Sequence, residues 1–520
     1  MALALQALLP FVALLGAAAI VRQRPRSPGN GWIAAAATGL AGVIALVELL
    51  RLSPGEHVDV PYLTTFPYAD LAIRLDGLSL AFATVTLITA ALLMLARQRL
   101  RGDRRDPWGG WLLTSAATCA LILADNLLLV YIALQLLTLA WSGALDEASP
   151  RRRGLRLVVQ VADIGLLLAA ASAIQSVGTS AFSGVPSDTF GLATFVLVLV
   201  PVAVRIGALT VIWGGPKAAV SFEPAIAWLA PAGYLLLRLL ALMAGQLPNR
   251  TTAVALFGVG VLGALAFAGL ALFERAGPRL AGLLLAAQAG LAIALSTGDQ
   301  PLLTVAGTWL WLMLVPLAGL ASIRTRDGSA PEALTLLSLA MVPGSLAFVG
   351  LWLAGLALNA RGLLFAMIPV GLVVVVAVMA VLSHLNVRWS RQLDVATVWA
   401  GLLLLVAGFP VIVINTIVVP AAATVRLVPR GMIAASPLGI ATGFGTFPAL
   451  PLSLVVGIGL GLLGWRLHGR LPWRPRGVGG GRAFPSRLPG RLRLPRLPAW
   501  SHFVLWGAFA AVVGAVATRP

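Results

Sequence analysis

Apolar runs of about 20 residues, separated by short polar stretches, recur along the whole 520-residue chain. A helix of that length crosses the roughly 30 Å hydrocarbon core of a bilayer. In lipid, a helix satisfies its own backbone hydrogen bonds, so the pattern predicts an all-α polytopic transmembrane bundle. About 16 spans are predicted, approximately 3–21, 31–50, 77–96, 109–124, 126–145, 155–175, 190–212, 224–244, 253–273, 278–297, 301–322, 332–356, 362–383, 394–419, 449–467 and 501–518.

The polar loops alternate in charge, which predicts an orientation. The loops after the first, third and fifth spans contain "RQRPR", "RQRLRGDRR" and "DEASPRRRGLR", whereas loops of the other parity, such as "SPGEHVDVPYLTTFPYAD" and "STGDQ", are poor in arginine. Because arginine and lysine collect in cytoplasmic loops, both termini are expected outside the cytoplasm of an inner (plasma) membrane protein. The first apolar run lacks a basic segment before it and is interpreted as a retained helix, not a cleaved signal.

The composition of the chain excludes several classes of ligand and partner. The chain is 59% hydrophobic and 11% charged, with a mean hydropathy of +0.95 and a net charge of +19. In a soluble protein this charge would suggest nucleic acid, but cytoplasmic loops explain it here, and membrane lipid is the expected partner instead. The single cysteine, Cys119, excludes disulfides and cysteine metal sites. No cofactor, metal site or catalytic centre of the chain's own is predicted.

Charged and amide side chains within the spans gather in the first half of the chain. Asp163 and Arg205 lie in the middle of spans six and seven, Gln135 lies in span five, and Asp125 falls at the turn between spans four and five. Intramembrane charges usually face the protein interior and pair, so Asp163 and Arg205 are expected to form a buried ion pair. Such a pair either belongs to a proton pathway or only locks two helices together. Arg238, in span eight, is expected nearer a helix end, with its guanidinium reaching toward the interface.

Two prolines fall inside predicted spans. Pro201, four residues before Arg205, and Pro343, in "SLAMVPGSLAFVG", each remove a backbone hydrogen bond and are expected to break spans seven and twelve. Because the two spans are five helices apart, they suggest two inverted five-helix repeats, spans 4–8 and 9–13. Broken helices at corresponding positions mark ion pathways in transporters, although membrane helices also tolerate proline for structural reasons alone.

The predicted spans divide the chain into five parts. The segment 466–496 contains only basic charges, with many prolines and glycines, so it is either a solvated cytoplasmic linker or an arm that binds anionic lipid or a partner protein. No role is assigned to residues 421–448. The parts are N-terminal helices at 1–108, a core of inverted repeats at 109–384, two spans and an outer loop at 385–465, the Arg/Pro/Gly-rich linker at 466–500, and a last helix at 501–520.

Five motifs, in order along the chain, resemble the antiporter-like membrane subunits of respiratory complex I (NADH-quinone oxidoreductase), a family shared with Mrp-type cation/proton antiporters and membrane-bound hydrogenases. The motifs are "RLDGLSLAFATV" (74–85), "DNLLLVYIALQLLTLAWSGAL" (125–145), "VVQVADIGLLLA" (158–169), "RIGALTVIWGGPKAAVSFEPAIAWLAPAGYLLLR" (205–238) and "RLAGLLLAAQAGLAIAL" (279–295).

The resemblance implies a mechanism from which this chain departs. In the family, a glutamate in span five pairs with a lysine in broken span seven, and this pair relays protons. Here Gln135 stands at the glutamate position and Arg205 at the lysine position. Gln135 does not titrate and an arginine keeps its proton in proteins. Asp163 matches the aspartate of the family's "GD" motif. The second repeat lacks the family's lysine in span eleven and has no charge beside Pro343.

These observations predict an antiporter-like subunit of a complex I-related or Mrp-like proton-translocating assembly, with a degenerate proton channel and other membrane subunits as partners. Hydrated Asp163, Asp125 and Gln135 could still form a proton wire. The alternative is a stand-alone secondary transporter of an anionic or zwitterionic solute, bound by Arg205 and Arg238, because arginine suits carboxylates and phosphates. A purely structural membrane scaffold is the third reading. The sequence leaves open the transported ion and the redox module.

Overall fold

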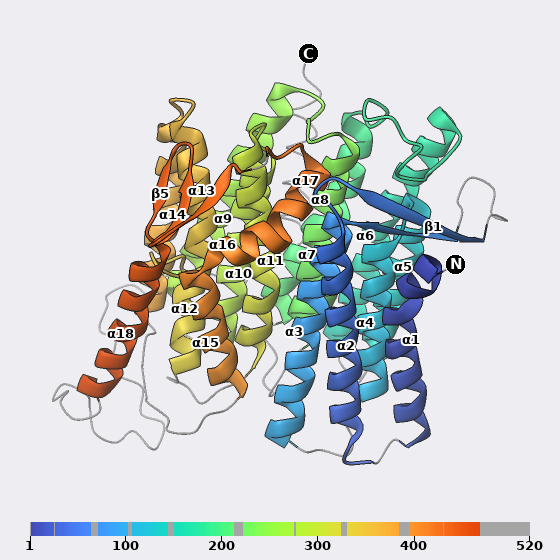
Figure 1. Ribbon diagram of the computed structural model, residues 1–520, viewed down its shortest axis with the longest axis horizontal. Helices are drawn as coiled ribbons and strands as arrows, with labels where there is room; N and C mark the ends of the chain where they lie inside the picture. Colours follow the sequence, from blue (N-terminus) through green and yellow to red (C-terminus); the bar gives the residue numbers. More distant parts are fainter. Residues whose placement is uncertain are drawn as a thin grey trace.

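The computed structural model is a bundle of long, roughly parallel helices (Figure 1). It describes residues 2–24, 27–63, 71–101, 107–143, 150–212, 222–274, 277–323, 330–383, 395–429 and 431–467. The helices of the bundle are α1 (Ala2–Gln23), α2 (Asn30–Arg51), α3 (Gly77–Arg101), α4 (Trp108–Leu123), α5 (Leu127–Gly143), α6 (Pro150–Val177), α7 (Leu192–Ile212), α8 (Ala230–Leu242), α9 (Arg250–Phe273), α10 (Gly277–Ser296), α11 (Pro301–Ser322), α12 (Ala330–Leu339), α13 (Leu346–Asn359), α14 (Met367–Leu382), α15 (Val395–Gly408) and α18 (Ala449–Leu467). A π-helical turn, η1 (Pro224–Leu229), leads into α8, and a short 3₁₀ turn, η2 (Leu364–Ala366), precedes α14.

The described residues contain ten helices that are long and apolar enough to cross a membrane, or eleven if one bent pair counts as a single span. This makes the chain a multi-pass membrane protein, but the expected total of about 16 spans is not confirmed. Two of the expected spans, α4 and α5, are shorter apolar helices. The last expected span, 501–518, and most of the arginine-rich segment lie outside the described residues.

The two prolines expected to break helices behave differently. At Pro343 the span is interrupted, because α12 ends at Leu339, α13 begins at Leu346, and Met341 and Gly344 in the turn have positive φ angles of 59° and 89°. At Pro201 the expected break is wrong, because α7 continues through the proline as one helix.

The predicted span at 394–419 is bent. After α15 the chain turns by 85° at Phe409 and continues as α16 (Pro410–Val413), the π-helical turn η3 (Ile414–Val418) and α17 (Val419–Val425). This segment runs across the bundle toward α3 and α8 (Figure 1). A Cβ atom at Gly77 would lie 2.2 Å from the Pro420 carbonyl oxygen, so only glycine allows this close approach. Thr424 Oγ1 accepts a hydrogen bond from the Leu78 N–H, 3.2 Å away, and fastens the crossing segment to α3.

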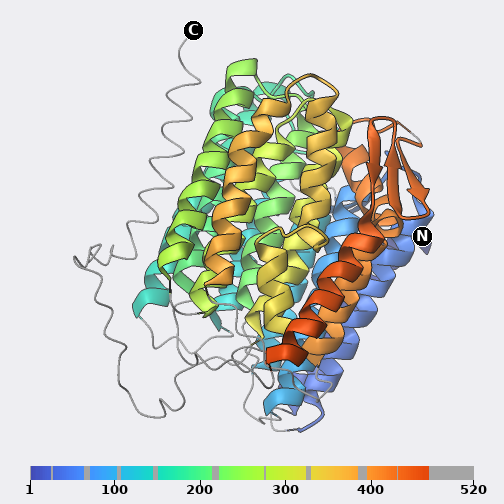
Figure 2. The ribbon, with the colours of Figure 1, turned by 90° about the vertical axis from the view of Figure 1, so that its left-hand side faces the viewer.

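Two small antiparallel sheets complete the fold. The hairpin of β1 (His57–Leu63) and β2 (Leu71–Asp76) precedes α3. The strands β3 (Ile433–Ser436), β4 (Gly439–Thr442) and β5 (Gly445–Phe447) form a meander between α17 and α18, within the 421–448 region that the sequence left without a role. Figure 2 shows this sheet at the upper end of the molecule, with α18 running away from it along the side of the bundle.

Candidate functional site: buried ion pairs in the bundle

Asp163 on α6 and Arg205 on α7 form a bidentate ion pair inside the bundle. Arg205 Nη1 donates to Asp163 Oδ1 at 2.6 Å, and Arg205 Nη2 donates to Asp163 Oδ2 at 3.0 Å. The exposed fractions of the two residues are 0% for Asp163 and 1% for Arg205. Arg205 Nη1 also donates to the Pro201 carbonyl oxygen at 3.2 Å. Planar guanidinium and carboxylate groups in this arrangement combine strength with fixed geometry.

Pro201 contributes to the close packing of α6 against α7. A proline has no N–H, so it leaves the Leu197 carbonyl, four residues earlier, without its usual helical donor. Gly165 of α6 lies against this carbonyl, and a Cβ atom there would be only 2.4 Å from the Leu197 oxygen. The glycine therefore allows the two helices to approach closely two residues from Asp163.

A second buried ion pair joins Arg238 on α8 to Asp76 at the end of β2. Arg238 Nη1 donates to Asp76 Oδ2 at 2.6 Å, and Nη2 donates to Asp76 Oδ1 at 3.0 Å and to Ser79 Oγ at 2.7 Å. Arg238 Nε donates to the Tyr234 hydroxyl at 3.1 Å, and the guanidinium lies 5.1 Å from the centre of the Phe182 ring. The expectation that Arg238 reaches toward the interface is therefore wrong. A buried carboxylate holds it, and four of its five N–H donors have partners.

The β1–β2 hairpin supplies the other charged residues of this network, because alternate side chains of each strand lie on the same face. His57 pairs with Asp76 and Asp59 pairs with Arg74 across the two strands, and side chains two residues apart share one face of a strand. Arg74 Nε donates to Asp76 Oδ2 at 3.0 Å, and its Nη1 lies 3.3 Å from Asp59 Oδ2. One face of the hairpin is thus ionic, and it lies against the end of α8.

Asp125, which the sequence suggested as part of a proton pathway, belongs to this network of hairpin residues and Arg238. Its Oδ1 lies 3.5 Å from Arg74 Nη1. Burial raises the pKa of the Asp125 carboxyl to about 6, and the Asp59 carboxylate raises it as well, while Arg74 lowers it. Asp76 behaves in the opposite way. Burial acts to raise its pKa, but the Arg238 charge and hydrogen bonds outweigh burial and hold the pKa well below its usual value.

Gln135 on α5 is half-buried, and its Nε2 finds no hydrogen-bond partner among the described residues. The structure does not bring Gln135 into either ion-pair network described above. The structure therefore pairs Asp163 with Arg205 and links Asp125 to Arg238 through Arg74 and Asp76, but leaves Gln135 apart from both networks.

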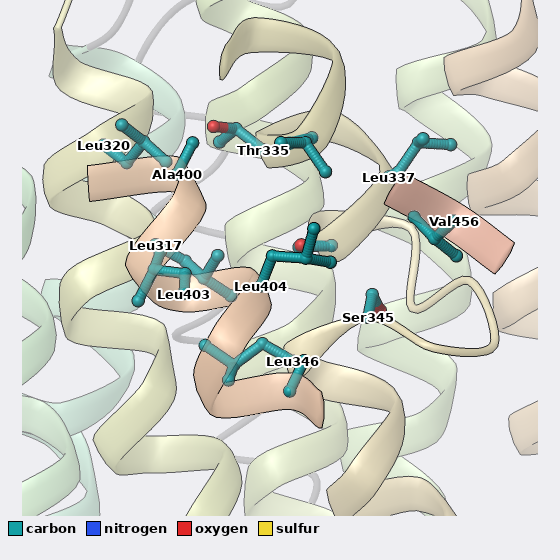
Figure 3. Close-up of a pocket in the computed structure, with 13 residues that line it drawn as sticks. Leu317, Leu320, Thr335, Leu337, Ser345, Leu346, Ala400, Leu403, Leu404 and Val456 are labelled. Carbon is teal, nitrogen blue, oxygen red and sulfur yellow. The ribbon is translucent and has the colours of Figure 1, made fainter. Parts of the chain in front are cut away.

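The second half of the described bundle is much less polar. Gln288 on α10 donates through Nε2 to the Ser338 and Leu339 carbonyl oxygens, each at 2.9 Å, and so satisfies the end of α12 where the helix is interrupted. A narrow pocket beside this turn is lined mainly by leucine and alanine side chains, with Thr335, Ser338 and Ser345 as its polar residues (Figure 3). Ser345 Oγ has no hydrogen-bond partner among the described residues. None of the described residues that line this pocket has a titratable side chain.

Sequence reasoning missed Asp76, Arg74 and Asp59. Asp76 lies in "RLDGLSL", which was singled out only for its resemblance, and it falls just before a predicted span. The available signal was chemical, because a buried Arg238 requires a carboxylate partner. Nothing in the spacing alone identifies which acidic residue supplies it.

No family model matches the sequence, and a search of curated proteins finds no match. The fold, however, is shared with chains of three solved membrane complexes. A chain of the Mrp complex from Dietzia sp. DQ12-45-1b superposes with a TM-score of 0.67 and 19% identity, over 100% of this chain and 63% of that one. This chain thus spans less than two thirds of that Mrp chain's length.

The second similar structure is the membrane-bound sulfane sulfur reductase, an archaeal respiratory membrane complex. Its matching chain has a TM-score of 0.70 and 16% identity, over 98% of this chain and 94% of that one. The third is respiratory complex I from Thermus thermophilus with bound NADH, with a TM-score of 0.63 and 20% identity over 82% of this chain and 99% of that one. The chain therefore shares its fold with chains of three membrane complexes, two of which, the Mrp complex and complex I, are of the kinds that the sequence motifs resemble.

Proposed function

We propose that the chain is an antiporter-like integral membrane subunit of a complex I-related or Mrp-like proton-translocating assembly, and that its central ion pair does not relay protons. The shared fold and the order of the five motifs support the first part. The similar structures are multi-subunit membrane complexes, which supports other membrane subunits as partners. The absence of a titratable lysine at position 205 supports the second part.

The observation that carries the proposal is the bidentate pair of Arg205 and Asp163. A lysine ammonium in this position can lose its proton when desolvated and regain it beside a carboxylate. A guanidinium keeps its proton and its fork fixes the carboxylate, so the cation of this pair cannot act as a proton donor and the pair has one geometry. The centre of the described bundle therefore holds a static ion pair in place of a switch.

The finer architecture belongs to the same proposal. It comprises two inverted five-helix repeats in the core at 109–384, about 16 spans in total, and both termini outside the cytoplasm. The interruption at Pro343 supports a broken helix in the second repeat. The corresponding helix of the first repeat, α7, is continuous, so the two repeats differ at this position. In this proposal the β1–β2 hairpin lies on the outer side, which the arginine-rich loops of the opposite parity support.

The alternative, a stand-alone transporter that binds an anionic solute through Arg205 and Arg238, is less well supported. Internal carboxylates hold both guanidinium groups in bidentate contact. A solute carboxylate would have to displace Asp163 or Asp76 and leave a buried charge unpaired.

Proton flux into liposomes that contain the purified chain tests the proposal. Wild type, Asp163→Asn and Arg205→Lys are compared under an imposed membrane potential, and an uncoupler added at the end of each run reports intact vesicles. Wild type and Asp163→Asn are expected to give the same low flux. A wild-type flux that Asp163→Asn abolishes would show a working relay and overturn the static ion pair.

The assembly is tested separately by native purification in mild detergent. Recovery with other membrane subunits in fixed stoichiometry is expected. Recovery of the chain alone, together with Arg205-dependent uptake of an anionic solute, would instead establish the transporter.

A further inference from the structure

The ionic network at the hairpin end of the bundle has more carboxylates than guanidinium groups. Arg74 and Arg238 face Asp59, Asp76 and Asp125. Asp76 is fully matched, because it accepts from both arginines and from the Ser79 N–H and hydroxyl. The surplus negative charge therefore lies on the other two carboxylates.

Asp59 and Asp125 share one donor. Arg74 Nη1 lies 3.3 Å from Asp59 Oδ2 and 3.5 Å from Asp125 Oδ1, both long for charged hydrogen bonds. Asp59 Oδ1 is buried without a hydrogen-bond partner among the described residues. Asp125 is only 5% exposed, so water does little to stabilise its charge. Two carboxylates that compete for one guanidinium in such a place cannot both be ionised cheaply.

We infer that Asp125 and Asp59 form a proton-binding site at the hairpin end of the bundle, where the pair takes up one proton and exchanges it with the solution on that side. With the proton bound, the three carboxylates and two guanidinium groups balance. Without it, the network carries one negative charge.

The groups around Asp59 and Asp125 define the proton-binding site and its route to solvent. On β1, His57 Nε2 lies 3.9 Å from Asp59 Oδ2, and the His57 side chain is 48% exposed. β2 contributes Arg74 and Asp76, and α8 contributes Arg238. The segment after α6 packs on Asp125 through backbone contacts, since the Phe182 N–H donates to the Asp125 carbonyl at 2.8 Å. The route to solvent therefore leads from Asp125 through Asp59, past His57.

The inference does not depend on proton flux through the bundle, because the site lies at one end and exchanges with one side only. The site differs from the central ion pair in how closely a guanidinium group neutralises its carboxylates. Asp163 has a guanidinium to itself, whereas Asp125 shares a more distant one with a second carboxylate.

Burial and the nearby Asp59 carboxylate raise the pKa of Asp125 to about 6, so the titration covers the pH range around 6. Infrared difference spectroscopy of the full chain in lipid, titrated with pH, detects the carbonyl stretch of protonated carboxyl groups. Wild type is expected to protonate one buried carboxyl with a midpoint near pH 6. Asp125→Asn removes this signal, and Asp59→Asn shifts the midpoint down by about one pH unit because the like charge is lost.

Asp299→Asn is the matched control. Asp299 is an exposed carboxylate that a single arginine, Arg361, holds, so this change leaves the signal in place. If Asp125→Asn does not fold, Asp59→Asn decides alone, since the partly exposed Asp59 is replaced by an isostere. Three results would each overturn the inference: no carboxyl protonation between about pH 5 and 7 in wild type, a signal that persists in Asp125→Asn, or a midpoint that Asp59→Asn leaves unmoved.

Discussion

Removing one partner of the Asp163–Arg205 pair is expected to destabilise the protein far more than removing both. Asp163→Leu leaves a guanidinium at 1% exposure without its two carboxylate hydrogen bonds, and Arg205→Met leaves an unpaired carboxylate at 0% exposure. Breaking a buried pair in this way costs about 3–5 kcal/mol of unfolding free energy. The double variant removes both charges of this pair, so it is expected to lie within about 1–2 kcal/mol of wild type.

The measurement is a double-mutant cycle, with unfolding in mixed detergent micelles followed by tryptophan fluorescence, for which the chain has 15 tryptophans. The expected coupling energy is about 3 kcal/mol or more. The exposed Arg361–Asp299 pair is the matched control and should give less than about 1 kcal/mol. Single variants that each cost less than about 1 kcal/mol, or a double variant whose cost equals the sum of the two, would refute the assignment of a buried, mutually dependent pair.

Three further changes probe other contacts. Gly165→Ala should destabilise the protein by about 1–3 kcal/mol, because the new Cβ meets the Leu197 carbonyl at 2.4 Å, whereas Gly154→Ala in the same helix, with open space around it, should be neutral or stabilising in the same unfolding assay. Gln288→Leu removes the side-chain donor of the Leu339 carbonyl and leaves the Ser338 carbonyl with the Met341 N–H alone, so it should cost about 1–3 kcal/mol. An unchanged unfolding midpoint would contradict this. Because its folded-state pKa is raised from 3.8 to about 6, Asp125 contributes stability that is fully present below pH 3.8 and lost as the pH rises through about 6. Asp125→Asn should flatten this part of a stability-against-pH curve, and an unchanged slope would show that another group causes it.

The helical bundle could be predicted because hydropathy reports directly on burial in lipid. The predicted span at 301–322 coincides with α11 at both ends, and Pro301 at its first position is favourable there. Bends were harder to predict. The sequence "GFP" at 408–410 contains the proline at which the chain turns, but an apolar run on both sides hid the turn in one long span.

Pro201 shows why a local rule can fail within a packed bundle. The rule that proline breaks a helix rests on the loss of one hydrogen bond and on a steric clash. In this protein α7 continues through Pro201, and Gly165 of α6 packs against the Leu197 carbonyl, which lacks the N–H donor that proline does not have. Only the three-dimensional arrangement contains that information, because residues 165 and 201 belong to different helices.

The two ion pairs differed in predictability for a related reason. Asp163 and Arg205 each lie in the middle of an apolar run, where a charge must find a partner, and they lie on consecutive helices. Arg238 has a partner on a β-strand outside every apolar run, where a carboxylate attracts no notice. Its burial depends on a hairpin that hydropathy does not detect.

The separations of the paired residues along the chain set an order of assembly. Asp163 and Arg205 are 42 residues apart on adjacent helices, so α6 and α7 can enter the bilayer together with this ion pair formed soon after α7 is synthesised. Asp76 and Arg238 are 162 residues apart, so Asp76 must wait for α8. Because Asp76 lies at the end of a strand and not within a span, it can remain in water until α8 has been synthesised. Membrane insertion thus leaves neither aspartate stranded in lipid without its arginine.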